Sequence, residues 1–376
     1  MINMPNMLMI GAAERNVGKT ELACEVIAGH RSAADIVGIK VSTVSEAHGE
    51  PTSIGRGRHA VDGPYEIIEE ASPPPGKDTA RLLAAGAKRV YRIKARREHL
   101  REGFKELLRA TGGGKLIVCE SNSLRLHVFP GIFLLVKRQF SGACKPSAAE
   151  VIKFADRLVL FDGHKQDIHP DEFKIIEGKW IWPIDANAVI MAGGNSTRMG
   201  TDKTLLQVNG EPLIKHLFRQ LHGTFSQVLV STGENREYDF LDHGRVVYDM
   251  ACGLGPLAGI LSSLENSEKD INFIVACDIP EIPLYLVRQM IASSSGYDCV
   301  IPITPSGHLE PLFGIYRKSM IAPVREVLAS GHRRVRDIFA RVRTNYFKLD
   351  DSTALKNLNT LDEYRDYLLE QRHDQI

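Results

Sequence analysis

Two glycine-containing loops in this sequence carry residues that could do chemistry. The first, residues 11–20 (GAAERNVGKT), follows an apolar strand-like segment and precedes a helical pattern. A loop that binds nucleotide phosphates supplies backbone N–H groups, a lysine for the β- and γ-phosphates and a hydroxyl for Mg²⁺. Ala13 stands where such loops usually have their first glycine, and the alternative is a strand–helix turn that contains GKT by chance. We expect nucleotide binding by Gly11, Gly18, Lys19 and Thr20.

A magnesium-dependent loop of this kind also needs a carboxylate at the end of a neighbouring strand. Glu120 ends the apolar run KLIVCE, and Asp162 follows RLVLF. We expect Glu120, together with Thr20, to hold Mg²⁺, with Asp162 as the second candidate. The alternative is that each carboxylate is only the polar residue that ends a strand.

The second loop lies within residues 188–210 (AVIMAGGNSTRMGTDKTLLQVNG). An apolar strand ends at Met191, and the glycines that follow allow bare backbone to approach a ligand. Release of pyrophosphate from a nucleoside triphosphate needs backbone N–H groups for the phosphates and cations that offset charge on the α-phosphate and the leaving group. Arg198 and Lys203 have the type and spacing for that role, so we expect both to be catalytic.

Two aspartates complete the second site. Asp278 follows INFIVAC, at the predicted carboxyl end of a buried strand, where ligands bind in open α/β sheets. A carboxylate there suits Mg²⁺, which prefers oxygen ligands, although it could instead cap the next helix. Asp249 ends RVVYD and precedes a glycine-rich turn, ACGLGPLAG, which could wall a nucleobase pocket or merely allow tight packing.

Together these strings resemble the molybdenum cofactor guanylyltransferases (MobA-type) over residues 188–369. The resemblance includes MAGGNSTRMGTDK, CDIP, EPLFGIYR, GHRRVRDIF and LNT. That family makes the dinucleotide form of the cofactor from GTP and molybdopterin-bound molybdenum and releases pyrophosphate. The resemblance implies that Asp278 binds Mg²⁺ and that the GTP contacts are Met191, Ala192, Gly193, Gly194, Lys203, Ser231, Asp249 and Asp278.

Individual residues within these motifs predict the nucleobase of the substrate and the residues that bind the pterin acceptor. Related cytidylyltransferases tend to carry Ala-Ala-Gly where this chain has Ala-Gly-Gly at 192–194, which favours GTP over CTP. Ser231 stands where the family often has asparagine. The pterin carries a phosphate and a hydrogen-bonding ring, which arginine and asparagine side chains suit. Our acceptor candidates are therefore Arg333, Arg334, Asn357 and Asn359.

The first half resembles a different family. Lys19, Thr20, Lys40, the segment GKDTAR at 76–81 and AGA at 85–87 are similar to the B-type molybdopterin-guanine dinucleotide biosynthesis proteins, over most of residues 7–162. Those proteins are small P-loop GTP-binding adaptors. The resemblance implies GTP binding, whereas Ala13 and the pair Glu120-Ser121, where the family has Glu-Gly, speak against hydrolysis.

Alternating strand and helix patterns must position these residues, and the pattern restarts at Ala188 after a probable hairpin, FKIIEGKWIWP. We expect two α/β domains. Residues 1–185 form a P-loop NTPase-like domain and residues 186–376 a Rossmann-like nucleotidyltransferase domain.

The composition excludes some partners. Lys and Arg total 47 against 46 Asp and Glu, so the chain has no large net positive charge that would attract nucleic acid. No apolar run reaches membrane-span length, and the apolar start at residues 1–10 lacks the basic region and cleavage site expected of a signal peptide. We expect a cytoplasmic protein, because the cysteine spacings fit a reducing compartment.

The sequence thus predicts a GMP transferase that uses GTP, Mg²⁺ and molybdopterin-bound molybdenum, fused to a GTP-binding adaptor that could serve acceptor molybdoenzymes. Two alternatives remain open. One is a nucleotidyltransferase with CTP or with another phosphorylated acceptor. The other is a non-catalytic GTP-binding carrier of the molybdenum cofactor.

Overall fold

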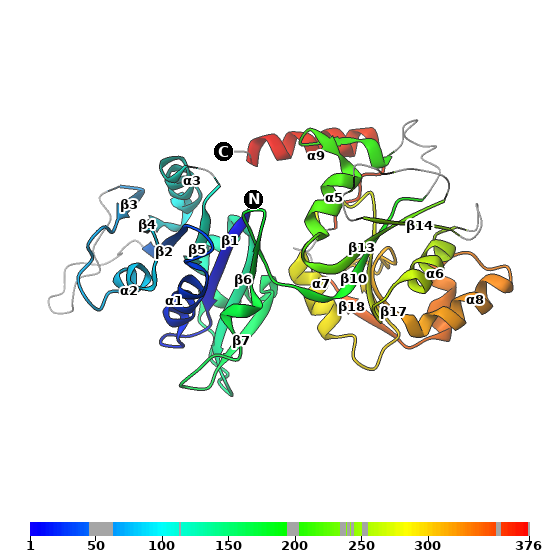
Figure 1. Ribbon diagram of the computed structural model, residues 1–376, viewed down its shortest axis with the longest axis horizontal. Coiled ribbons are helices and arrows are strands. Elements are labelled where there is room, and N and C mark those ends of the chain that lie inside the picture. Colours follow the sequence, from blue (N-terminus) through cyan, green and yellow to red (C-terminus); the bar gives the residue numbers. More distant parts are fainter. Residues whose placement is uncertain are drawn as a thin grey trace. The chain divides into compact units, whose positions relative to one another are not determined.

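The computed structural model describes residues 1–44, 63–112, 114–193, 203–233, 238, 241, 244–249, 255–350 and 355–374. Their contacts divide the chain into two units, Met1–Trp182 and Pro183–Arg372 (Figure 1). Among the described residues each unit contains one seven-stranded sheet with helices packed against it. The expected mixed α/β architecture with parallel strands is therefore confirmed.

In the first unit the strand order is β3-β4-β2-β5-β1-β6-β7, parallel except for β3 at the edge. The strands are β1 (Ile2–Ala12), β2 (Ile36–Val44), β3 (Tyr65–Glu69), β4 (Arg89–Arg96), β5 (Leu116–Glu120), β6 (Val128–Arg138) and β7 (Arg157–Phe161). The helices are α1 (Lys19–His30), α2 (Asp78–Ala85), α3 (Leu100–Thr111) and α4 (Pro146–Ala149).

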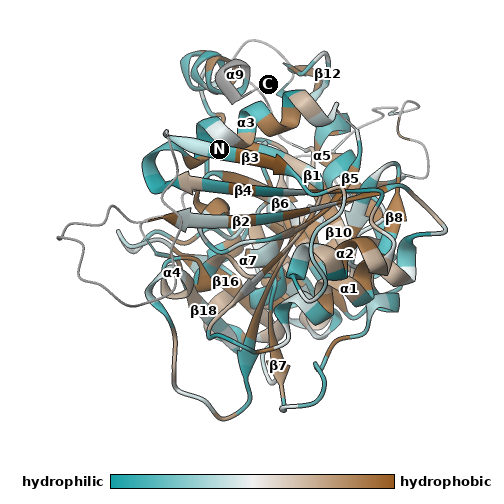
Figure 2. Ribbon diagram, turned by 90° about the vertical axis from the view of Figure 1, so that its left-hand side faces the viewer, coloured by the Kyte–Doolittle hydropathy of each residue, from teal (hydrophilic) through white to brown (hydrophobic). Residues whose placement is uncertain are grey.

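The sheet of the first unit is buried on both faces. Leu100, Phe104 and Leu107 of α3 pack on one face, and residues of α1 and α2 pack on the other. Apolar residues concentrate in the central strands (Figure 2), and every residue of β5 is buried. Because strands covered on both faces have no side for water, charged groups can be placed only where the strands end.

The predicted hairpin is confirmed as β8 (Lys174–Ile176) and β9 (Lys179–Ile181), joined by a two-residue turn. The segment SAAEVIKFA at 147–155 predicts one helix by its sequence pattern, and this prediction is wrong in its extent. The structure has the single turn α4 followed by a short 3₁₀ segment, Ile152–Phe154. β-branched residues at 151 and 152 favour helix weakly, and the Asp156 carboxylate accepts a hydrogen bond from Phe133 N at 2.7 Å, which ties the segment to β6.

In the second unit the order is β14-β13-β10-β15-β17-β16-β18. The strands are β10 (Ile184–Met191), β13 (Phe225–Thr232), β14 (Arg245–Tyr248), β15 (Ile271–Ala276), β16 (Cys299–Ile303), β17 (Phe313–Arg317) and β18 (Thr344–Lys348), with a two-residue pair β11 (Gln207–Val208) and β12 (Glu211–Pro212). The helices are α5 (Leu213–Leu221), α6 (Pro256–Asn266), α7 (Leu284–Ala292), α8 (Ile321–Ala329) and α9 (Leu361–Asp374).

β17 is the exception to the parallel arrangement, because it runs antiparallel to both β15 and β16. The other pairs, β13–β10, β10–β15, β13–β14 and β16–β18, are parallel. Buried residues of α6 and α8 pack against one face of this sheet. Within the described residues, no helix is long and apolar enough to cross a membrane.

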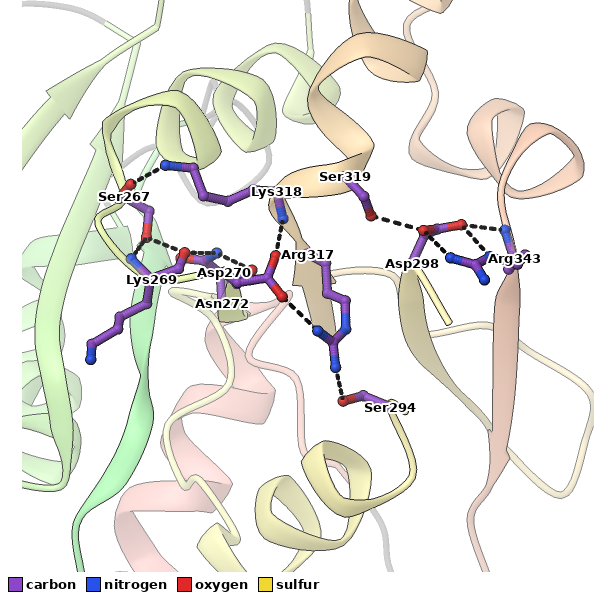
Figure 3. Close-up of polar contacts among 10 residues, drawn as sticks. All are labelled: Ser267, Lys269, Asp270, Asn272, Ser294, Asp298, Arg317, Lys318, Ser319 and Arg343. Atoms are coloured by element: carbon purple, nitrogen blue, oxygen red, sulfur yellow. Dashed lines mark hydrogen bonds and ion pairs between the residues drawn. The ribbon is translucent and has the colours of Figure 1, made fainter. Parts of the chain in front are cut away.

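Asp298 joins three strands at the amino-terminal end of β16 (Figure 3). Its carboxylate accepts hydrogen bonds from Arg343 N at 2.9 Å, from the Arg343 guanidinium at 3.1 and 3.2 Å, and from Ser319 Oγ at 2.8 Å. Its carbonyl accepts from Arg317 N of β17 at 2.9 Å. These donors, above all the Arg343 guanidinium, lower the pKa of the Asp298 carboxyl to about 2.

This network generates a pH-dependent prediction. The side chain of Asp298 is 15% exposed, so Asp298→Asn should lower the free energy of unfolding at pH 7 by roughly 1–2 kcal/mol. A carboxyl whose folded pKa is depressed stabilises above its unfolded pKa and loses that effect as pH falls through the folded pKa. The difference between variant and wild type should therefore shrink below about pH 4. Urea unfolding followed by circular dichroism tests this, with exposed Asp362→Asn as the control. A difference unchanged at pH 2.5 would contradict it.

Candidate functional site

The loop after β10 begins at the carboxyl end of the sheet in the second unit. Met191 is the register partner of Ser231 in β13 and of Ala276 in β15. Ala192 is buried and its N–H donates to the Ser231 carbonyl at 2.8 Å, whereas Gly193 is exposed. Two other residues predicted here, Gly194 and Arg198, lie outside the described residues.

Ser231 and Asp249 form a hydrogen-bonded pair beside that loop. Ser231 Oγ donates to Asp249 Oδ1 at 3.0 Å, and Asp249 N donates to the Thr232 carbonyl at 3.0 Å. Burial raises the pKa of the Asp249 carboxyl, and the hydrogen bond from Ser231 opposes this. The structure therefore brings together two of the predicted GTP residues from adjacent strands.

Gly259 of α6 explains part of the glycine-rich segment after Asp249. A Cβ at this position would lie 2.8 Å from Ser231 Oγ, 3.0 Å from Asp249 Oδ1 and 2.8 Å from Met191 Cε. Only a residue without a side chain lets α6 approach the pair this closely. The sequence left two interpretations of the glycine-rich turn open, a wall of a nucleobase pocket or tight packing. The described part of the turn shows tight packing, and Gly259 packs against residues that are predicted to bind the ligand.

Lys203 and Asp278 meet at the end of β15. Lys203 Nζ lies 3.4 Å from Asp278 Oδ2, and the two side chains are 19% and 25% exposed. Cys277 N donates to the Met191 carbonyl at 3.1 Å, which extends the pairing of β10 and β15 to the residue before Asp278. The carboxylate is therefore held at the strand end beside the loop that follows β10, as predicted for a site at that edge of the sheet.

Three contacts around Asp278 were not predicted from the sequence. Gln220 of α5 bonds the backbone after Asp278 twice, to Pro280 O at 2.8 Å and from Ile282 N at 3.0 Å. Leu358 N donates to the Asp278 carbonyl at 2.7 Å. Glu310 lies opposite Asp278 when the antiparallel register of β15 and β17 is continued past Val275 and Phe313. Burial raises the pKa of Glu310, and the charge of Asp278 adds to this.

The four acceptor candidates lie on two segments. Arg333 and Arg334 line a depression of about 360 Å³ with Gly331, His332 and Asp337, and the Arg333 carbonyl lies close to Gly255, which precedes α6. Asn357 is half-buried with its Oδ1 lacking a hydrogen-bond partner among the described residues. The Asn359 side chain is exposed, and its N–H donates to Glu363 at 2.7 Å.

In the first unit, the loop that begins at Ala13 links β1 to α1. Gly11 belongs to β1 rather than to the loop, and a Cβ there would lie 2.8 Å from Asn122 Oδ1. Asn122 also bonds both the N–H and the carbonyl of Ala12, at 2.8 and 3.0 Å. Ala13 is fully buried and pairs with β6 through Val136 O. Gly18, with φ of 74°, precedes α1.

Lys19 and Thr20 both contact Glu120, at the end of β5. Lys19 Nζ lies 3.2 Å and Thr20 Oγ1 3.1 Å from Glu120 Oε2. Glu120 is 0% exposed, and its Oε1 has no partner among the described residues. Lys40 Nζ lies 3.9 Å from the same Oε2 and also pairs with Asp78 of α2. Burial lowers the pKa of Lys40, although the charge of Glu120 opposes this.

Asp162, the second carboxylate candidate, lies elsewhere. It follows edge strand β7 and accepts hydrogen bonds from His164 N and Lys165 N at 2.7 and 2.8 Å. These bonds lower the pKa of the Asp162 carboxyl. The carboxylate therefore stabilises the turn at residues 162–165. Glu120 is the carboxylate that contacts the loop residues.

Two further cations, Arg15 and Lys145, lie in or near the loop. Lys145 N donates to the Ala13 carbonyl at 2.8 Å. Burial lowers the pKa of the Lys145 ammonium, and the charges of Lys19 and Arg15 add to this. Within the described part of the chain, neither Arg15 nor Lys145 has a carboxylate partner. The positive charge of the exposed Arg15 and the half-buried Lys145 suits an anionic ligand such as a phosphate.

The comparisons with known proteins concern the second unit. Residues 188–346 match the family model "MobA-like NTP transferase domain". A probable molybdenum cofactor guanylyltransferase of Pelotomaculum thermopropionicum is 38% identical over 176 residues, which cover 46% of this chain and 84% of the relative. The molybdenum cofactor guanylyltransferase of Shewanella putrefaciens is 31% identical over 199 residues, covering 50% and 99%.

Among solved structures, molybdopterin-guanine dinucleotide biosynthesis protein A from Archaeoglobus fulgidus is similar with a TM-score of 0.45 and 20% identity, over 50% of this chain and 99% of that one. The two curated relatives are aligned over most of their own length and exceed 30% identity. Through its second unit, this chain belongs to the molybdenum cofactor guanylyltransferase family.

Proposed function

We propose that the second unit transfers GMP from GTP to molybdopterin-bound molybdenum cofactor and releases pyrophosphate. The observation that carries this proposal is the contact of Lys203 with Asp278 beside the loop that follows β10. A cation and an acidic metal ligand at one strand end are what transfer of a nucleotidyl group requires. Membership of the guanylyltransferase family supports GTP as the substrate.

The transfer needs no covalent enzyme intermediate, because the attacking oxygen of the molybdopterin phosphate is already anionic. That oxygen forms a bond to the α-phosphorus of GTP, and the bond from the α-phosphorus to the bridging oxygen breaks. Pyrophosphate leaves with the electron pair. Lys203 offsets the charge that grows on the phosphates, and we assign Arg198 the same task.

The residues at the end of β15 fit a magnesium ion. Mg²⁺ prefers oxygen ligands and keeps several waters, so it is usually bound by one or two carboxylates and the substrate phosphates. Within the described residues no group of three or more His, Cys, Asp or Glu side chains could hold a metal. Asp278, a carboxylate at the strand end, would hold Mg²⁺ together with phosphate oxygens, and the ion would supply positive charge that offsets theirs.

The remaining predicted contacts surround this centre. We assign the nucleoside of GTP to the pair Ser231 and Asp249, with the backbone at 191–194 against the phosphates. Arg333, Arg334, Asn357 and Asn359 are our candidates for the pterin. A nucleotidyltransferase that uses CTP or another acceptor would need the same centre, so substrate comparison decides between them.

We further propose that the first unit binds GTP as an adaptor, with phosphates on the loop and Mg²⁺ held by Thr20 and Glu120. The contacts of Lys19 and Thr20 with the buried Glu120 support this proposal, as do the cations Arg15 and Lys145. A carrier of cofactor without transferase activity is the competing function. It predicts nucleotide binding without release of pyrophosphate.

The transferase proposal predicts that Asp278→Asn retains its fold but loses at least about 100-fold in rate, because the neutral amide no longer holds the cation. Pyrophosphate release with Mg²⁺ and molybdopterin-bound molybdenum measures this, with GTP, CTP and ATP compared. Exposed Asp362→Asn is the control. Release with CTP alone would overturn the base assignment, and a near wild-type Asp278→Asn would remove this residue from the metal site.

Gly259→Ala should raise the KM for GTP about tenfold while kcat changes less than about threefold. The added Cβ must displace the hydrogen bond between Ser231 and Asp249, at a cost of roughly 1–2 kcal/mol. Steady-state kinetics with varied GTP measures the split. A roughly tenfold fall in kcat with no change in the KM for GTP would argue that Ser231 and Asp249 do not bind the nucleotide.

Lys19→Ala should abolish nucleotide binding by the first unit, because the lysine contacts the β- and γ-phosphates in such loops. Hydrogen–deuterium exchange of the full chain separates the two units. GTP should protect residues 11–22 in the wild type but not in the variant, and should protect residues 188–193 in both. Exposed Lys88→Ala is the control. Unchanged protection at 11–22 in the Lys19 variant would count against the phosphate-binding loop.

A further inference from the structure

Lys40 contributes to the candidate nucleotide site of the first unit from β2, on the opposite side of β5 from the loop that follows β1. It is the register partner of Glu120 across β2 and β5, and Ile10 is the partner of Glu120 across β1 and β5. These three residues form one row across neighbouring strands at the carboxyl edge of the sheet. Lys19 comes from the loop beyond β1, and Lys40 from the strand on the far side of Glu120.

The two lysines share one carboxylate oxygen. Lys19 Nζ and Lys40 Nζ lie 3.2 and 3.9 Å from Glu120 Oε2, so a single phosphate group can touch both ammonium groups. Both lysine side chains are 23% exposed, which leaves them accessible to a ligand from solvent. Glu120 Oε1, fully buried, has no partner in the described part of the chain. An incomplete set of partners at a buried carboxylate points to a ligand that completes it.

The position of Lys40 selects one part of a nucleotide. In loops of this kind the backbone N–H groups hold the inner phosphates and the lysine reaches the β- and γ-phosphates. Lys40 lies two strands away from β1 in the order β1, β5, β2, on the side of Glu120 away from the loop. In a nucleotide held this way, the terminal phosphate would be the group farthest from the loop backbone and therefore nearest to Lys40.

We propose that Lys40 contacts the terminal phosphate of a nucleoside triphosphate in the first unit and makes this site prefer triphosphates over diphosphates. The proposal rests on the proposed nucleotide binding by the first unit. Asp78, the other partner of Lys40, is 37% exposed and can turn to solvent when a phosphate takes its place.

A purely structural role for Lys40 makes a different prediction. If the ion pair between Lys40 and Asp78 only fastens α2 to the sheet, then Lys40→Met and Asp78→Asn break the same contact and should have the same effect. If Lys40 contacts phosphate, only its own removal affects the discrimination between nucleotides. Asp78→Asn is thus the matched control, and Lys88→Met, 63% exposed on the same unit, controls for loss of a positive charge.

The experiment titrates the full chain with Mg²⁺ and either GDP or guanosine 5′-(β,γ-imido)triphosphate. Hydrogen–deuterium exchange of residues 11–22 reports binding to the first unit, separately from residues 188–193. Loss of one charge-assisted hydrogen bond should weaken triphosphate binding to Lys40→Met about 10- to 100-fold. GDP binding should stay within about twofold. Lys40→Arg should retain the triphosphate preference, and Lys40→Gln replaces Lys40→Met should that variant not fold.

Equal weakening of both nucleotides, or a loss of preference in Asp78→Asn equal to that in Lys40→Met, would overturn the role of Lys40 and leave the nucleotide site intact. A wild-type chain in which neither nucleotide protects residues 11–22 would overturn the nucleotide site itself. A wild type that binds the two nucleotides equally well would remove the proposed preference while retaining the site.

Discussion

The candidate sites of both units depend on an ion pair between a lysine and a carboxylate at the end of a parallel strand. Lys19 Nζ lies 3.2 Å from Glu120 at the end of β5, and Lys203 Nζ lies 3.4 Å from Asp278 after β15. In each unit that strand pairs with the strand that leads into the glycine-containing loop. The central strands are buried on both faces, so charges can gather only at their ends. This constraint places loop, lysine and carboxylate together.

Local patterns were enough to predict these centres. A glycine-containing loop after an apolar run, followed by a lysine, identified Lys19 and Lys203, and a polar residue that ends an apolar run identified Glu120 and Asp278. Such signals lie within about 20 residues of chain, and the rule that parallel strands end at one edge supplies the rest. The α/β architecture and the hairpin before the second unit followed from the same periodicity.

Other contacts could not be predicted, because the residues that make them are distant in sequence. Gln220 holds the turn after Asp278 from 60 residues away, and nothing in the pattern of α5 marks it as more than a helix residue. Glu310 faces Asp278 only because β17 is antiparallel, whereas the alternating pattern favoured parallel strands. The register of β2 on β5 brings Lys40 to Glu120. Strand order and register, which single-sequence patterns do not contain, decide all three contacts.

The two carboxylates differ in burial, and the difference agrees with the proposed roles. Glu120 is 0% exposed, and Thr20, Lys19 and Lys40 lie 3.1, 3.2 and 3.9 Å from one of its oxygens, whereas Asp278 is 25% exposed. A unit that only holds a nucleotide gains from a buried carboxylate, since contacts strengthen in surroundings of low dielectric constant. A transferase must admit a second substrate beside the same carboxylate and then release pyrophosphate, so its centre needs an open side. Under the proposed roles, the same strand-end chemistry would serve retention of a nucleotide in the first unit and turnover in the second.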